Sequence, residues 1–367
     1  MPLPAPLEHA LALARLATGL SEPNPRVGCV LVGADGQVLG EGHTQRAGGP
    51  HAEIVALRDA QSRGHALRGA TAYVTLEPCA HHGRTGPCCD ALVAAGVGRV
   101  VGSCTDPNPL VAGRGFERLR AAGIDVQVGP GAAETRELNL GFFSRMVRGT
   151  PWVRLKVAAS LDGKTALDDG RSQWITGEAA RADGHAWRAR ATAVLTGIGT
   201  VLQDDPRLDV RLAEAPRQPD LVVVDSRLET PPTARLFLPG RQLRIYAAVD
   251  DPKRRADLQA RGAEVIVLPN ASGKVDLPAM LRDLAAREVN ELHVEAGFKL
   301  NGSLVREGLV DEVLAYLAPS LVGQGQGIAS FGPLPALDAA VPLVFRSVDR
   351  VGDDLRIVAR VAGRDAF

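Results

Sequence analysis

The sequence is poor in aromatic residues and has no excess of charge of either sign. Aromatic side chains make up 4% of the 367 residues, and 42 lysines and arginines balance 42 aspartates and glutamates. The chain has no basic block or stripe, and its aromatics are too few to stack a row of bases. These absences argue against a nucleic-acid-binding surface.

Long apolar runs are also missing, and we expect no secretion signal. No apolar segment approaches the length of a membrane span, and residues 1–9 lack the basic segment typical of a signal peptide. The chain has five cysteines. Because an odd number cannot all pair, this count favours free thiols and metal ligands over a disulfide framework. We therefore expect a cytoplasmic enzyme that does not act at a membrane, with enough chain for two or three domains.

What the sequence does contain is a metal-binding pattern. His51-Ala52-Glu53 is followed, after 23 residues, by Glu77-Pro78-Cys79 and then by Cys88-Cys89. This is the ligand set of zinc hydrolytic deaminases. One imidazole and two thiolates suit Zn²⁺ and leave a fourth position for water, whose pKa zinc lowers towards about 7. Glu53 is then available to carry a proton from that water to the departing amine.

The spacing of the cysteines departs from the compact Pro-Cys-x-x-Cys form, because eight residues separate Cys79 from Cys88. A helix is expected from Cys89 to a stop at Gly96, which places Cys88 at a helix N-terminus, where the dipole favours a thiolate. We therefore predict Cys88 as the third ligand, with Cys89 as its rival. His81 and His82 could also ligate, but we interpret them as polar loop side chains that contact substrate or water.

The pattern of apolar residues divides the chain near Thr150 into residues 1–148 and 149–367. In the first part we expect a helix over 7–17, strands over 27–32, 72–76 and 99–104, and helices after His51 and Cys88. His51 and Glu53 would point about 200° apart in a regular helix, so we place the pair in a cap or first turn. A charged helix over 136–148 is expected to serve as the linker.

The second part predicts a mixed α/β sheet. Its strand-like runs are 153–159, 193–197, 221–225, 244–249, 265–268, 292–295, 312–317 and 355–361. The dinucleotide fingerprint G-x-G-x-x-G is absent. Gly197-Ile198-Gly199-Thr200, after a strand, and Gly297–Ser303, before a helix, are weaker candidates for phosphate-binding loops.

Several polar residues of this part allow two interpretations. Arg154 and Lys156 share one strand face, which is either solvated or a basic wall for phosphate. Trp174 either packs in a core, as is usual for tryptophan, or covers a nicotinamide ring from its polar loop. Asp204 and Asp205 are interpreted as a turn. Arg207 and Arg211 are either ordinary surface charges or bind a phosphate between them.

The long insert identifies a family resemblance. The segment Glu77-Pro78-Cys79-Ala80-His81-His82-Gly83-Arg84-Thr85-Gly86-Pro87-Cys88 resembles the deaminase domain of the bifunctional deaminase–reductases of riboflavin biosynthesis. Residues 24–29, 49–53 and 106–109 look like the same family, as do 159–164, 172–176 and 294–297 in the second part. The resemblance covers nearly the whole chain. Gly86, where the family often has a second proline, is a minor departure.

The resemblance implies a cytidine-deaminase-like α/β domain, then a dihydrofolate-reductase-like mixed-sheet domain that uses NADPH. The first would hydrolytically deaminate a phosphoribosylamino-pyrimidine, and the second would reduce its ribosyl chain to the ribityl form. Zinc would be bound by His51, Cys79 and Cys88, with Glu53 as the proton shuttle. NADPH would contact Ala158, Trp174, Thr200, Asp204, Ser226, Gly297, Phe298, Lys299, Leu300, Asn301, Gly302 and Ser303. The substrate would contact Ser172, Arg188, Leu208, Arg211 and Glu295.

Two other classes of function stay open from the residues. One is a single-activity zinc deaminase of nucleobases or nucleotides with a C-terminal binding domain, which salt-insensitive activity on a free nucleotide would separate from a nucleic-acid enzyme. The other is a zinc-stabilised scaffold, for which four protein ligands are usual and Glu53 would be idle. We expect a small pyrimidine nucleotide as the partner of the site, and a homo-oligomer.

Overall fold

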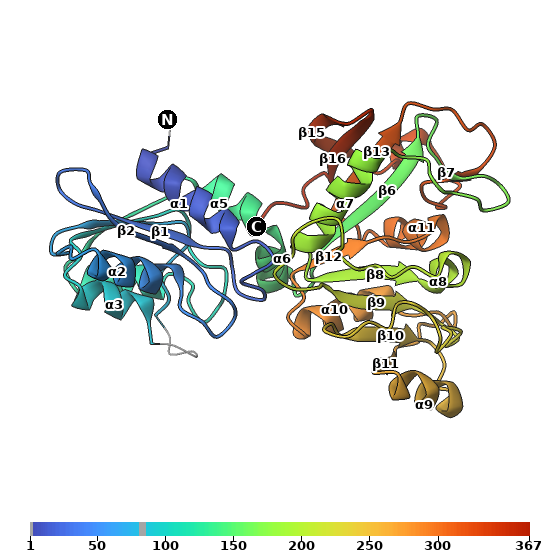
Figure 1. The fold of residues 1–367 in the computed structure, drawn as a ribbon, viewed down its shortest axis with the longest axis horizontal. Helices are drawn as coiled ribbons and strands as arrows, with labels where there is room; N and C mark the ends of the chain where they lie inside the picture. The colour runs from blue at the N-terminus through green and yellow to red at the C-terminus, as the bar shows by residue number, and fades with distance from the viewer. Residues whose placement is uncertain (1–2, 81–85) are drawn as a thin grey trace. The chain divides into compact units, whose positions relative to one another are not determined.

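The computed structural model describes residues 3–80 and 86–367, and it divides into two compact units, 1–148 and 149–367. Each unit is built around one extended β-sheet with helices on its faces (Figure 1). His81 and His82 lie outside the described residues. In the described part of the chain, no helix is both long and apolar enough to cross a membrane.

The N-terminal unit contains a sheet of five described strands in the order β2-β1-β3-β4-β5. The central strand β3 (Thr71–Val74) runs antiparallel to β1 (Gly28–Val32) and parallel to β4 (Arg99–Gly102). The outer strands are β2 (Val38–His43) and β5 (Asp125–Val128). Helix α1 (Ala5–Leu16) lies on one face, and α2 (Ala52–Ser62) and α3 (Cys88–Ala94) lie on the other, with α4 (Arg114–Ala121) beside α3 (Figure 1).

Three glycines let helices approach this sheet at backbone distance. A Cβ at Gly28 would stand 1.9 Å from the carbonyl oxygen of Ala10 in α1, and one at Gly40 would stand 2.4 Å from that of Ala56 in α2. A Cβ at Gly42 would stand 2.6 Å from the Cβ of Val55. Real Cβ atoms do not approach so closely, so α2, whose first residues carry the metal motif, rests directly on strand β2.

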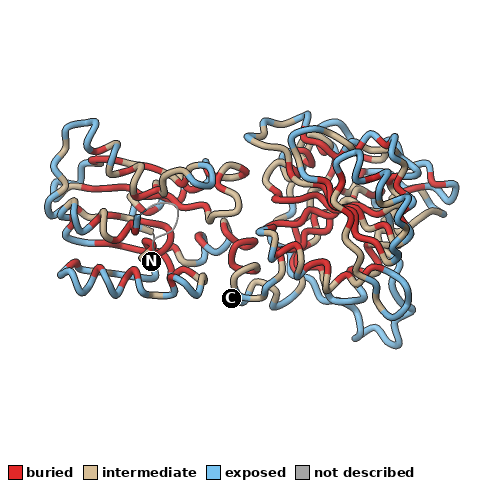
Figure 2. The backbone as a smooth tube through the Cα atoms, turned by 90° about the horizontal axis from the view of Figure 1, so that it is seen from below, coloured by how far each residue is buried: buried red, intermediate tan, exposed pale blue. Residues whose placement is uncertain are grey.

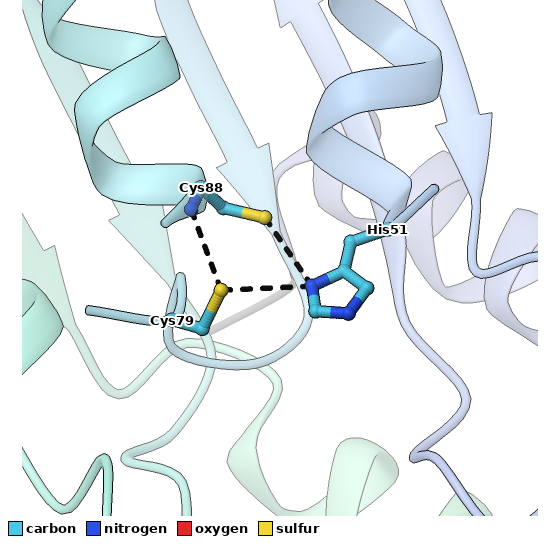
Figure 3. Close-up of side chains that lie close together, drawn as sticks. All are labelled: His51, Cys79 and Cys88. Atoms are coloured by element: carbon cyan, nitrogen blue, oxygen red, sulfur yellow. Dashed lines mark hydrogen bonds between the residues drawn. The ribbon is translucent and has the colours of Figure 1, made fainter. Parts of the chain in front are cut away.

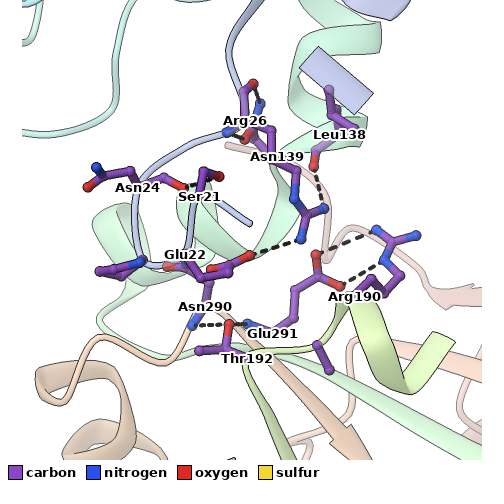
Figure 4. A network of polar contacts seen from close by, with 12 residues as sticks. Ser21, Glu22, Asn24, Arg26, Leu138, Asn139, Arg190, Thr192, Asn290 and Glu291 are labelled. Atoms are coloured by element: carbon purple, nitrogen blue, oxygen red, sulfur yellow. Dashed lines mark hydrogen bonds and ion pairs between the residues drawn. The ribbon is translucent and has the colours of Figure 1, made fainter. Parts of the chain in front are cut away.

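The prediction of a single linker helix over 136–148 is wrong. The chain instead makes α5 (Ala132–Leu138) and α6 (Leu140–Arg148), which are separated at Asn139. The Asn139 side chain accepts a hydrogen bond from the Arg26 backbone N–H at 2.7 Å and donates to the Arg26 carbonyl at 3.0 Å (Figure 4). Because α6 also buries Phe142 and Phe143, it belongs to the N-terminal core rather than to a solvated connector.

The C-terminal unit contains a mixed sheet of nine described strands in the order β11-β10-β9-β8-β12-β6-β13-β16-β15. The first seven run parallel, and β13, β16 and β15 pair antiparallel. The mixed sheet predicted from the sequence is therefore confirmed. In chain order the strands are β6 (Trp152–Ser160), β8 (Ala193–Gly197), β9 (Asp220–Val224), β10 (Leu243–Ala247), β11 (Ala263–Val267), β12 (Glu291–Val294), β13 (Glu312–Ala318), β15 (Leu343–Val351) and β16 (Asp354–Val361).

Helices cover both faces of this sheet. Helices α10 (Leu277–Ala286) and α11 (Phe298–Arg306) pack with one set of strand residues, among them Leu155 and Leu195. Helices α7 (Glu178–Arg190) and α9 (Pro252–Ala260) pack with the alternate set on the other face. The buried strands form the continuous red centre of this unit in Figure 2. Helix α8 (Ile198–Asp204) begins directly at the end of β8.

The structure contradicts both interpretations of Arg154, as a solvated side chain and as part of a basic surface for phosphate. Arg154 and Lys156 do share the face of β6 opposite the apolar residues, but Arg154 is 1% exposed. Its guanidinium pairs with Glu312 at 2.6 Å and Glu291 at 2.8 Å and lies over the ring of Trp187. A buried arginine held by two carboxylates is neither a solvated surface charge nor an open phosphate site, because its donors are already engaged.

Candidate functional site

The predicted zinc ligands meet at the starts of two helices of the N-terminal unit. His51 is the N-cap of α2, Cys88 is the first residue of α3, and Cys79 lies in the loop after β3 (Figure 3). The cap and helix-start positions expected for His51 and Cys88 are confirmed. The extended backbone at an N-cap turns the His51 side chain out of the helical direction, so that it faces the two sulfurs.

The spacing of these donors fits a tetrahedral zinc ion. The His51 Nδ1 atom lies 3.6 Å from Cys79 Sγ and 3.3 Å from Cys88 Sγ, and the ligating atoms of the trio all lie within 4.8 Å of one another. Bonds of about 2.0–2.3 Å to zinc at tetrahedral angles separate nitrogen and sulfur ligands by roughly 3.5 Å. Three protein donors leave one position open, which is the arrangement of a catalytic rather than a structural zinc site.

The structure brings Cys88, and not Cys89, to the metal-ligand cluster. The Cys89 sulfur lies 3.8 Å from Oδ1 of Asp90, outside the His51–Cys79–Cys88 trio. The backbone N–H of Cys88 also donates to the Cys79 sulfur at 3.3 Å. Hydrogen bonding with Cys88 lowers the pKa of the Cys79 thiol to about 4, against the effect of its burial. The pKa of the Cys88 thiol is instead raised, by the same hydrogen bond with Cys79 and by burial, so the negative charge of the pair lies on Cys79.

Glu53 stands beside this cluster on the second residue of α2 and is buried. Burial, with the nearby Cys79 adding to it, raises the pKa of the Glu53 carboxyl to about 7. A carboxyl group that titrates near neutral pH can both accept and release a proton during one reaction. The chemistry that the cluster supports is thus proton transfer next to a Lewis-acidic metal.

Glu77 has a positioning task that the sequence motif did not reveal. Its carboxylate accepts hydrogen bonds from four backbone N–H groups, of Gly115 (2.7 Å), Gly113 (2.9 Å), Asp106 (3.1 Å) and Phe116 (3.4 Å). Gly115 is required there, because a Cβ would stand 1.9 Å from the Pro78 carbonyl oxygen. The clamp fixes the segment around Pro78, and hence Cys79, against the loop between β4 and α4.

The C-terminal unit has two adjoining cavities at the carboxyl ends of its parallel strands. The smaller, of about 180 Å³, and the larger, of about 820 Å³, share five lining residues, which include Thr200, Gly297 and Phe298. The larger cavity lies at the point where the strand order changes between β8 and β12, a usual position for nucleotide ligands. Twelve predicted contact residues line one or both cavities: Ala158, Ser172, Thr200, Asp204, Ser226, Glu295, Gly297, Phe298, Lys299, Leu300, Asn301 and Ser303.

Five predicted contact residues lie outside the lining of these two cavities. Gly302 is packed against Ser330, where a Cβ would stand 1.8 Å from the carbonyl oxygen, and Leu208 is buried. Trp174 is 68% exposed, so the usual packing of tryptophan in a core is wrong here, and Arg181 lies over its ring. The others are Arg188 and Arg211, and the ligand contacts of all five stay predictions.

Arg188 and Arg211 are engaged with acidic groups. Arg188 forms a two-pronged pair with Glu295, at 2.6 Å and 2.9 Å, and donates to the Asp209 carbonyl. Arg211, with Arg207, pairs with the Asp209 carboxylate at 2.8 and 2.9 Å. Burial alone would raise the pKa of Glu295, but Arg188 and Lys156 outweigh it and hold that pKa well below its usual range.

The two glycine segments differ from the expected loops. Gly197 and Gly297 are N-caps, and α8 and α11 begin at the next residue, so Lys299–Ser303 are helical rather than a loop before a helix. Residues of both helix starts line the larger cavity, and the N–H groups of a first helical turn, which have no acceptor within the helix, suit an anion. Asp204 ends α8 and Asp205 follows with φ of 42°, which confirms the turn.

Comparison with known proteins agrees with this two-part architecture. Residues 5–104 match the family profile described as "Cytidine and deoxycytidylate deaminase zinc-binding region", and residues 151–357 match the "RibD C-terminal domain". The chain is 45% identical over 363 residues to riboflavin biosynthesis protein RibD of Escherichia coli K12, covering 95% of this chain and 96% of that protein. The RibD protein of Aquifex aeolicus is 39% identical, with 96% of each chain covered.

Two solved structures share the whole fold. Acinetobacter baumannii RibD superposes with a TM-score of 0.87 at 39% identity, and 97% of each chain is covered. The diaminohydroxyphosphoribosylaminopyrimidine deaminase/5-amino-6-(5-phosphoribosylamino)uracil reductase of Thermotoga maritima gives 0.86 at 33% identity, with 97% of this chain and 98% of that chain covered. The fold and the site define a bifunctional enzyme, a zinc deaminase joined to a reductase. The chain belongs to the RibD family of riboflavin-biosynthesis proteins.

Proposed function

We propose that the N-terminal unit deaminates 2,5-diamino-6-(5-phosphoribosylamino)pyrimidin-4(3H)-one and that the C-terminal unit reduces the product. The substrates are those named for the Thermotoga relative, which the chain matches over nearly its full length. The observation that carries the deaminase assignment is the His51–Cys79–Cys88 trio with the buried carboxyl of Glu53 beside it.

In the deamination step, His51, Cys79 and Cys88 would hold the zinc. When bound, zinc supplies a Lewis acid that makes water a nucleophile at neutral pH. Glu53 takes the proton of the attacking water and returns it to the exocyclic amine, which leaves as ammonia. Its pKa, raised to about 7 by burial, matches this double task.

In the reduction step, the larger cavity accommodates NADPH and the smaller one the ribosylamino end of the pyrimidine. Helix starts at Gly197 and Gly297 provide N–H groups for the coenzyme phosphates. Lys156, Ser172 and Glu295 line the smaller cavity and would orient the ribose, to whose C1′ the hydride is delivered. The coenzyme supplies the hydride and the chain supplies its orientation.

The decisive assay follows both reactions on one sample. Purified protein with zinc, the diamino substrate and NADPH should release ammonia and lose the coenzyme absorbance in equal amounts. Removal of zinc by a chelator should stop ammonia release, while NADPH oxidation with the pre-deaminated substrate continues. NADPH oxidation without any deaminated product would overturn the order of the two steps.

We also propose that the two activities separate at the boundary between residues 148 and 149. The contact pattern divides the chain at this position, and each unit has its own core and its own candidate site. A chain starting at Gly149 should oxidise NADPH with the deaminated substrate in the absence of zinc. Failure of this folded fragment to bind either ligand would show that its site needs the N-terminal unit.

We propose that the protein is a cytoplasmic homo-oligomer that associates through the C-terminal sheet. Strand β15 is the last in the strand order, and eight apolar side chains between Phe331 and Val348 are 37–90% exposed. Exposed apolar side chains gathered in one segment are typical of protein–protein contacts. In sedimentation velocity, Phe345→Ser should lower the oligomer mass, whereas Leu161→Ser, a comparably exposed control, should not.

The cytoplasmic location is supported by the five cysteines, none of which forms a disulfide, because thiols persist in a reducing compartment.

A further inference from the structure

The loop over residues 205–211, which follows helix α8, has an unusual backbone. Asp205 and Leu208 have φ angles of 42° and 50°, in the left-handed region that residues other than glycine adopt at a cost in free energy. Leu208 is also buried, with 6% of its surface exposed. Such a backbone conformation persists only where surrounding groups hold it, so this loop depends on partners elsewhere in the chain.

Arg241, two residues before strand β10, supplies much of that support. Its Nη1 donates to the carbonyl of Leu208 at 2.8 Å. Its Nη2 donates to the carbonyls of Arg207 at 2.6 Å and Leu236 at 2.9 Å. One planar guanidinium therefore binds two consecutive carbonyls of the loop and ties them to the segment before β10, at the residue whose φ is positive.

The charge of Arg241 strengthens these hydrogen bonds. Burial lowers the pKa of its guanidinium to about 10, against the effect of the nearby Asp209 carboxylate, so the group stays protonated at neutral pH. The Asp209 carboxylate is itself paired with Arg207 and Arg211, and the hydrogen bonds of Arg241 go to backbone carbonyls instead. A cationic donor binds a carbonyl more strongly than a neutral one does, so Arg241 is suited to hold the loop in place.

The same loop is also tied to a wall of the smaller cavity. The Asp209 carbonyl accepts a hydrogen bond from Arg188 of α7, and the Arg211 backbone N–H donates to Nδ1 of His185 at 3.3 Å. Arg188 in turn holds both carboxylate oxygens of Glu295, which lines the smaller cavity. A shift of the Asp209 carbonyl would therefore turn the Arg188 guanidinium and, with it, the carboxylate of Glu295.

We propose that Arg241 is a positioning residue of the reductase, which fixes the loop so that Arg188 keeps the Glu295 carboxylate directed at the ribosyl chain of the substrate. This inference rests on the proposed reduction in the smaller cavity. Arg241 lies outside the lining of both cavities, so it acts through Arg188 and Glu295. Residues 205–211 also lie outside the lining of the larger cavity, so binding of the coenzyme there should not depend on Arg241.

The test measures the two ligands of the reductase separately in the full-length Arg241→Gln variant. With the deaminated substrate, kcat/KM should fall by about 10- to 100-fold, the scale expected when a group at the reacting centre is displaced by about 1 Å. The Kd for NADPH, measured by calorimetry, should stay unchanged. Arg364→Gln is the matched control, because the Arg364 guanidinium also binds a backbone carbonyl, that of Gly308 at 2.8 Å, and this variant should change neither value.

A second variant separates positioning from support of the fold. Lysine keeps the charge of Arg241 but cannot bind three carbonyls through one planar group, so Arg241→Lys should retain the native melting temperature and recover only part of kcat/KM. If Arg241→Gln does not fold, the same comparison of substrate with NADPH is made in Arg241→Lys. Equal losses for substrate and NADPH would show that Arg241 only supports the fold and would overturn the proposal.

The native protein distinguishes a failure of this inference from a failure of the proposed function. If the native protein reduces the deaminated substrate with NADPH and Arg241→Gln does so with the same kcat/KM, the reductase assignment stands and the positioning role is wrong. If the native protein does not reduce this substrate, the proposed function of the smaller cavity is itself wrong.

Discussion

Replacing Glu77 by glutamine should loosen the N-terminal unit at the point that holds Cys79. The carboxylate accepts two N–H groups on each oxygen, and glutamine can accept on one oxygen while its amide turns donors towards the other pair. Two charge-assisted bonds are lost and buried N–H groups are left without acceptors, so we expect a loss of about 2–4 kcal/mol in the free energy of unfolding. For a unit of this size that corresponds to a fall of roughly 5–15 °C in melting temperature.

The assay can assign this effect to one unit. The three tryptophans, at 152, 174 and 187, all lie in the C-terminal unit, so tryptophan fluorescence reports the unfolding of that unit alone. Glu77→Gln should lower an unfolding transition seen by circular dichroism, speed zinc loss to a chelator and leave the fluorescence transition in place. Glu117→Gln, an exposed change in the same helix region, is the control. A Glu77→Gln protein that melts and keeps zinc like the native one would refute the clamp.

Three further predictions concern the ligands, the proton shuttle and a buried histidine. Cys88→Ser should lose zinc and deamination, whereas Cys89→Ser should keep both, as metal analysis of the two purified proteins will show; the reverse pattern would exchange the ligands. Glu53→Gln should keep zinc but deaminate about 10²–10⁴-fold more slowly, with reductase activity intact; near-normal ammonia release would remove Glu53 from the mechanism. Burial lowers the pKa of His293 to about 3. Below pH 6.5 the unfolded chain therefore binds a proton that the folded chain excludes. The free energy of unfolding should then fall by about 1.4 kcal/mol for each pH unit by which the pH is lowered. Urea midpoints of tryptophan fluorescence at pH 7.5 and 5.5 should therefore differ less in His293→Leu, and an unchanged difference would contradict the pKa shift.

The metal cluster could be predicted from the sequence because its residues are separated by short, recognisable segments. Helix starts after His51 and Cys88 follow from local signals, and those starts decide where the side chains point. The core strands of the second unit were equally visible, since buried parallel strands are continuous apolar runs. Edge strands such as β2 and β15 were not, because their residues are mixed or exposed and carry little periodic signal.

Other features depended on partners that lie far away in the chain. Arg154 is paired with Glu291 and Glu312, more than 130 residues away, so its burial has no local sign. The break at Asn139 depends on Arg26, and the clamp of Glu77 depends on backbone groups near Gly115. Long-range hydrogen bonds of this kind appear only once the fold has brought the segments together.

The glycines beneath α1 and α2 imply a constraint on how this chain can vary. At Gly28, Gly40 and Gly42 the space for even a methyl group is filled by the backbone or Cβ of a helix. Any larger residue at Gly40 or Gly42 would lift α2, and with it the imidazole of His51 and the carboxyl of Glu53. A complete substitution scan should therefore find these positions as intolerant as the metal ligands themselves, although neither glycine has any chemistry to contribute.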